Sequence, residues 1–150
     1  MDAVTYPQED VARFINQNVV ALRVGSGEQP MASDFNITWT PSLLILDADG
    51  KEHQRTLGFF APEDLIPSLL KGIGKMHLNR NELLEALDRF EELQLHHAGS
   101  AAVPETIYLA GVARYKNTGD ARELKTAYEL LRDRYGENPW TKRASPYRLL

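Results

Sequence analysis

The amino-acid sequence predicts a protein of mixed α and β structure, with an α/β first half over residues 1–74 and an all-helical second half over residues 75–150. Two observations carry this prediction. In the first half, short apolar runs bounded by turn-forming residues alternate with helical patterns, whereas the second half shows helical patterns alone. A chain of 150 residues is also long enough to bury a core in one domain or in two small ones.

The patterns of the first half predict helices and strands in alternation. Helices are expected after Pro7, at residues 31–35 and from Pro62, because proline and acidic residues suit the first turn of a helix. Strands are expected at the apolar runs of residues 19–24 and 42–46, and also at residues 52–57. The last two strands flank an Asp-x-Asp-Gly turn and therefore predict a β-hairpin.

The second half repeats a helical pattern. Apolar periodicity predicts helices around residues 83–93, 107–115 and 124–131. At an offset of 37 residues Gly74 aligns with Gly111, and after one inserted residue Phe90 aligns with Tyr128. A period of this length predicts helical hairpins in which small residues occupy the helix crossings.

Composition excludes several classes of protein. The chain has no cysteine, which removes disulfide scaffolds, cysteine-ligated metals and every thiol mechanism. Its net charge of −4 argues against the basic surface that general nucleic-acid binding needs. Neither a membrane-length apolar run nor a signal-peptide pattern occurs. We therefore expect no nucleic-acid and no membrane partner, and a cytoplasmic protein, or a periplasmic one if an upstream signal has been lost.

Part of the second half resembles a tetratricopeptide repeat. The positions that carry the likeness are Gly111, Tyr115, Gly119, Asp120 and the closing pair Asn138–Pro139. The match is degenerate at Leu124, where the family has a small residue, and a weaker copy begins at Gly74. The resemblance implies a groove that binds peptides, and the alternative is that these helices simply cap the first half.

Residues 1–74 resemble a thioredoxin-family domain that lacks its N-terminal portion. The likeness is carried by Trp39, Thr40 and Pro41 with the apolar run that follows, then Asp49–Gly50, Gly58 and the helix from Pro62. The resemblance implies an incomplete mixed sheet, a cis peptide bond before Pro41, the tail of a helix near Thr5 and a strand at residues 19–24.

The family's Cys-x-x-Cys motif and central strand would precede Met1. The resemblance implies that this strand would lie between residues 19–24 and 42–46, so those two strands either close up or accept a strand from elsewhere. Three explanations stay open: a fragment or misassigned start of a disulfide oxidoreductase, a cysteine-free relative used for binding, or a chance likeness of an ordinary α/β unit. An in-frame strand and Cys-x-x-Cys upstream would identify the first.

The candidate binding residues are Trp39, Thr40 and Pro41. In the family that this segment resembles, the backbone before this proline lies beside the substrate and can pair with an extended peptide. The alternatives are that Pro41 only shapes the start of a strand and that Trp39 is a half-buried core residue, which the sequence favours for Trp39. The leading function is a protein-interaction module for a protein or an extended peptide, with a homodimer through exposed sheet edges as a further expectation.

No catalytic residue, metal or cofactor is expected. Thiol–disulfide exchange requires a thiolate, which this chain cannot supply. The adjacent His96 and His97 project in different directions on a helix. The segment from Asp47 to Gly50 lacks the remaining ligands of a calcium loop, so a hairpin turn is the better interpretation.

Overall fold

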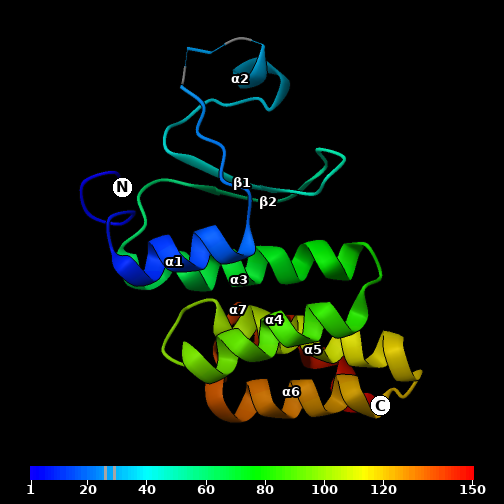
Figure 1. Cartoon of the computed structure of the whole chain (residues 1–150). Helices are drawn as coiled ribbons and strands as arrows, with labels where there is room; N and C mark the ends of the chain where they lie inside the picture. Colours follow the sequence, from blue (N-terminus) through cyan, green and yellow to red (C-terminus); the bar gives the residue numbers. More distant parts are fainter. Residues whose placement is uncertain (26, 29) are drawn as a thin grey trace.

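The computed structural model of the chain describes residues 1–25, 27–28 and 30–150 (Figure 1). It has mixed α and β architecture, as the sequence predicts. The elements in chain order are α1 (Glu9–Asn18), α2 (Met31–Asp34), β1 (Ser42–Leu46), β2 (Glu52–Leu57), α3 (Pro62–Asn79), α4 (Leu83–His96), α5 (Val103–Thr118), α6 (Arg122–Tyr135), α7 (Pro139–Ala144) and the 3-10 helix η1 (Ser145–Leu149).

The elements form layers around α3. In Figure 1, α3 lies under one face of the β1–β2 hairpin with α1 beside it, α2 lies over the other face, and α4 to α7 follow on the far side of α3. The helix α3 is therefore shared between the sheet and the helical half. The division that the sequence predicts at residue 74 falls inside this continuous helix.

The predicted hairpin is confirmed. β1 pairs with β2 in antiparallel register, from Ser42 opposite Leu57 to Leu46 opposite Glu52, with a bulge near its turn. The carboxylate of Asp47 closes the turn, because its Oδ1 accepts hydrogen bonds from the backbone N–H groups of Asp49 at 3.0 Å and Lys51 at 2.9 Å. A short side chain that bonds its own downstream backbone is a common way to fix such a turn.

One face of α3 packs on the sheet. Leu65 and Leu69 of α3, Ile45 of β1 and Val11 of α1 form a buried apolar cluster. Two acidic residues follow Pro62 in the first turn of α3, where they suit the helix dipole. Pro67 is buried inside the helix, where it has no N–H to donate to the carbonyl oxygen of Glu63, four residues earlier.

The helices α4, α5 and α6 are confirmed, and they pack in sequence against α3 and one another. A Cβ atom placed on Gly74 would lie 2.4 Å from the Phe90 ring, and one on Gly111 would lie 2.4 Å from the Cβ of Ala127. The two glycines that align at an offset of 37 residues therefore both lie at helix crossings, between α3 and α4 and between α5 and α6.

The predicted strand at residues 19–24 is wrong. This segment is irregular, with Val20 fully exposed and Leu22 74% exposed. Within the described residues the sheet contains β1 and β2 alone, so it is antiparallel rather than mixed. A strand needs a neighbour to pair its backbone groups, and no described strand pairs with residues 19–24. The expected helical tail near Thr5 is a series of turns instead.

Candidate functional site

The predicted binding residues lie together immediately before β1. Trp39, Thr40 and Pro41 are all exposed, and the peptide bond between Thr40 and Pro41 is cis, as expected. The expectation that Trp39 belongs to the core is wrong, because its side chain is 63% exposed. A two-stranded sheet offers too little surface to cover an indole at its end.

Two further apolar side chains are exposed at the same end of the hairpin. The carbonyl oxygen of Pro41 accepts a hydrogen bond from the N–H of Gly58 at 2.8 Å. The residues on either side of that glycine, Leu57 and Phe59, are 53% and 60% exposed. We call Trp39, Leu57 and Phe59 the hairpin-end surface. Leu57 and Phe59 were not among the predicted binding residues, although the hairpin register places them on either side of the residue opposite Pro41.

The N-terminal turns support this surface from below. Thr5 is fully buried, and its hydroxyl donates a hydrogen bond to the carbonyl oxygen of Phe60 at 2.6 Å. This bond fixes the backbone that follows β2. Phe60 therefore joins the cluster around Val11 and Leu65, whereas its neighbour Phe59 points outward.

β1 presents an open edge. In an antiparallel pair, alternate residues direct their backbone groups to the neighbouring strand. Because Pro41 bonds to Gly58, the residues Leu43 and Ile45 are the next to face β2, so the backbone groups of Ser42 and Leu44 face the other way. Among the described residues no strand pairs with β1 on that side.

An arginine holds the segment after α2 over the outer face of the hairpin. The guanidinium of Arg55 donates to the carbonyl oxygens of Phe35 at 2.6 Å and Asn36 at 3.2 Å. It also forms an ion pair with Glu52 at 2.6 Å, which holds the pKa of that carboxyl below its usual value. The position of the loop that leads to Trp39 thus depends on a charge-assisted link to β2.

A buried polar network joins the hairpin turn to the end of α3. The Nε2 atom of His53 lies 2.8 Å from Oδ2 of Asp47, and its Nδ1 atom lies 3.1 Å from the side-chain amide of Asn79. The hydrogen bond with His53, together with two backbone bonds, lowers the pKa of Asp47 to about 2 although burial opposes the shift. The side chain of His53 is 1% exposed. Because both ring nitrogens are engaged away from solvent, this pair is structural and not a base for an external substrate.

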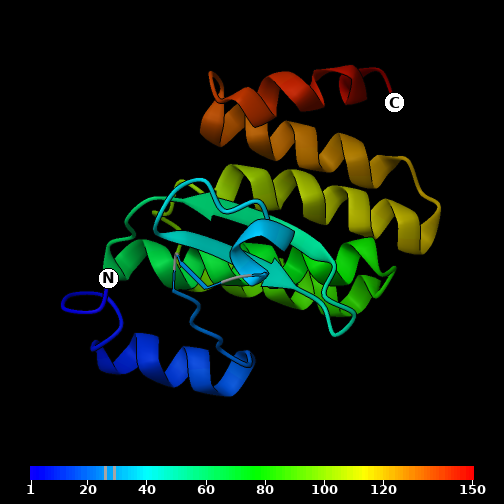
Figure 2. The same cartoon turned by 90° about the horizontal axis from the view of Figure 1, so that it is seen from above.

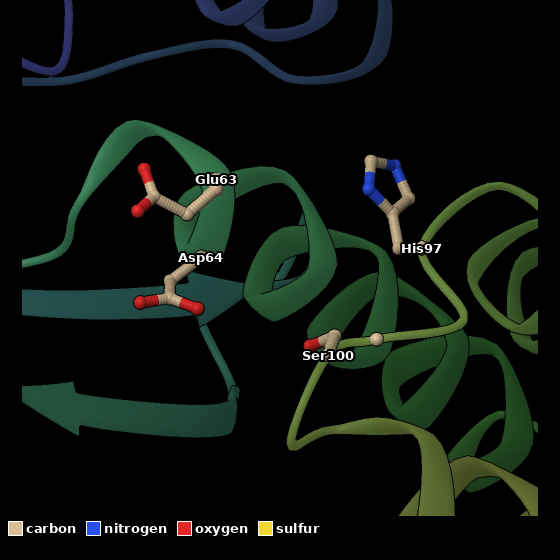
Figure 3. Close-up of a pocket in the computed structure, with 5 residues that line it drawn as sticks. Glu63, Asp64, His97 and Ser100 are labelled. Atoms are coloured by element: carbon tan, nitrogen blue, oxygen red, sulfur yellow. The ribbon is translucent and has the colours of Figure 1, made fainter.

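Two shallow hollows lie on the β2 side of α3. The larger, of about 400 Å³, lies between Thr56 to Phe60 and the loop before α5. The smaller, of about 220 Å³, is lined by Glu63, Asp64, His97 and Ser100 among others (Figure 3). In Figure 3 the two carboxylates and the imidazole point in different directions and do not converge on one point. Burial and the neighbouring His96 lower the pKa of His97. This arrangement fits neither a catalytic group nor a metal site.

The described residues contain no group of three metal-ligating side chains close enough to hold an ion. In the same part of the chain no helix combines the length and the apolar character needed to cross a membrane. Comparison with protein-family models, with curated proteins and with solved structures finds no match to this chain.

Proposed function

We propose that this chain is a thioredoxin-like protein without redox cysteines that binds an extended peptide segment of another protein. One observation carries the proposal, namely that Trp39, Thr40 and Pro41 are exposed together at the end of the hairpin, beside Leu57 and Phe59. The order of elements also supports it, because a helix, a hairpin and a further helix follow one another as in the family that the segment resembles.

The proposed contact has a polar and an apolar part. The backbone of Thr40 is solvent-exposed beside Pro41 and pairs with the main chain of the bound peptide. Apolar side chains of the peptide cover Trp39 and Phe59, since exposed aromatic residues are the commonest source of binding energy at protein interfaces.

The helical half acts as a cap in this proposal. We assign residues 75–150 to tetratricopeptide-like hairpins that support the thioredoxin-like residues 1–74. The helix α5 is covered over its first three turns, with Val103, Ile107 and Ala110 all inside the core, and only its last four residues are exposed. A helix covered in this way supports the capping role over a peptide-binding groove.

Peptide binding is tested with S-carboxymethylated insulin B chain labelled with fluorescein, which serves as an extended, thiol-free probe. We expect saturable binding in fluorescence anisotropy that Trp39→Ala and Phe59→Ala each weaken by about tenfold, as truncation of an aromatic anchor does. The matched control is Leu95→Ala, because Leu95 is 75% exposed on α4, away from the hairpin. Equal binding by all four proteins, or no saturation by the wild-type chain, would refute the proposal.

A second candidate is a disulfide oxidoreductase whose Cys-x-x-Cys lies upstream of Met1. Two features of the described residues favour it: β1 has an edge with no neighbouring strand, and the apolar residues 19–24 are exposed. An upstream strand that lies between β1 and residues 19–24 would explain both the open edge and the exposed segment. Codons for a strand and a Cys-x-x-Cys motif in frame before Met1 would establish this candidate, and their absence would remove it.

A further inference from the structure

We propose that two copies of this chain associate by strand exchange, in which residues 19–24 of each copy add to the open edge of β1 in the other. Each copy supplies both parts of the contact, which are the receiving edge of β1 and the donated residues 19–24. The proposal concerns the edge of β1 and not the hairpin-end surface, so it stands independently of peptide binding.

The receiving edge has the features of a strand that accepts a partner. β1 consists of a serine followed by four apolar residues and carries no charged residue. The outward backbone groups of Ser42 and Leu44 provide two donors and two acceptors for a neighbouring strand. Natural edge strands are usually protected by a lysine or a proline within the strand, or by another segment that covers them. β1 contains neither residue, because Pro41 lies just before the strand begins.

The donated segment has the composition of a buried strand but is largely exposed to solvent. Four of its six residues are valine or leucine, which favour strands. The segment leaves α1 in an extended conformation, with φ −142° and ψ 157° at Val19. Val20 is 100% exposed and Leu22 is 74% exposed. Its single charge, on Arg23, is paired with Asp2 at 2.9 Å.

The two parts lie on the same side of the molecule. In Figure 2, α1, from which the segment departs, lies on the β1 side of the hairpin, and β2 lies on the opposite side. A two-fold axis beside β1 therefore brings each segment to the β1 edge of the other copy and closes the assembly as a dimer. The added strand also covers Phe14 and Ile15 of α1, which are only partly buried in the single chain.

Sedimentation equilibrium of the full chain tests the proposal. Over about 1 to 200 µM we expect the mass to rise from 16.9 kDa towards twice that value. Val20→Lys and Leu22→Lys place a charge in the contact and raise the dissociation constant by at least about tenfold. Both side chains are exposed in the single chain, so circular dichroism and the thermal midpoint stay unchanged at about 1 µM, where the wild-type chain is monomeric. Leu95→Lys on α4 is the control and leaves association intact.

Hydrogen exchange shows whether the edge of β1 is covered by the second copy, is covered by a rearranged part of the same chain, or is exposed to solvent. We expect the amides of Ser42 and Leu44 to be protected in the dimer and exposed in Leu22→Lys at the same concentration. A strict monomer at every concentration would overturn the proposal, whether those amides are protected by an internal rearrangement or exposed. A dimer that both lysine variants preserve would also overturn it, because another surface would then hold the copies together.

Discussion

Gly111 shows how a single residue sets the distance between two helices. A Cβ atom at this position would lie 2.4 Å from the Cβ of Ala127 and 3.4 Å from the backbone oxygen of Glu123. Neither neighbour is the flexible end of a side chain, so α5 and α6 must separate to admit a methyl group. We therefore predict that Gly111→Ala lowers the free energy of unfolding by roughly 1–2 kcal/mol, because overpacking outweighs the gain of about 1 kcal/mol in helix propensity.

Urea unfolding measures this change, and Gly99→Ala is the matched control. No atom lies within 4 Å of a Cβ placed on Gly99, which is in the loop between α4 and α5. We expect the control to change stability by less than about 0.5 kcal/mol. A Gly111→Ala chain as stable as the wild type would mean that the helix crossing is looser than the structure describes.

At the scale of elements, the network around Asp47 ties the hairpin to the end of α3. Asparagine at this position keeps an oxygen for the turn, but its N–H group faces the Nε2–H of His53. Two donors would then face each other without an acceptor, so Asp47→Asn is expected to destabilise the chain. The pKa of Asp47 is lowered from 3.8 to about 2 in the folded protein. Its charge therefore stabilises the fold above about pH 4, and this contribution is lost as the pH falls towards 2.

The pH dependence distinguishes this network from a general effect of mutation. We predict that the difference in urea midpoint between the wild-type chain and Asp47→Asn is largest above pH 4 and closes as the pH approaches 2. Asp49→Asn, in the same turn, is the control because its side chain is 87% exposed. A difference that stays constant over this pH range would show that the charge of Asp47 plays no part.

The elements that could be predicted from the sequence are those specified by local pattern. The hairpin follows from the apolar run at residues 42–46 and the Asp-rich turn that leads into residues 52–57, and α3 to α6 follow from apolar periodicity with acidic residues in the first turns. Residues 19–24 carry an equally clear strand pattern, yet a strand forms only where a neighbour pairs its backbone. The bond between His53 and Asp47 escaped prediction because a bulge in the hairpin, which no local pattern signals, alters the register beside them.

For the candidate site, the family resemblance of this segment was sufficient to single out Trp39, Thr40 and Pro41 and to expect the cis bond. The exposure of Trp39 could not be inferred in the same way, because it depends on how many strands the sheet contains. A wider sheet would provide neighbours for the indole, whereas β1 and β2 alone leave it 63% exposed.

At the scale of the whole molecule, the two halves of the chain differ in their ability to fold alone. The largest apolar cluster joins α3 to α7 and includes Leu70, Leu93, Ile107 and Leu131. It is contained almost entirely in residues 62–150. A fragment of these residues is therefore expected to be helical and to unfold cooperatively, because it keeps α3 as the first helix of the stack.

Residues 1–74 alone are expected not to fold. Their sheet has two strands, and the helix that supports it, α3, loses the cover that α4 gives to its other face. The cut at residue 74 also removes the last turn of α3 and Leu78, which packs with Phe90. Far-UV circular dichroism on heating should show a sigmoidal transition for 62–150 and a gradual change for 1–74. A sigmoidal transition in 1–74 would support the division at residue 74, whereas a disordered 62–150 would mean that the hairpin stabilises the helical stack.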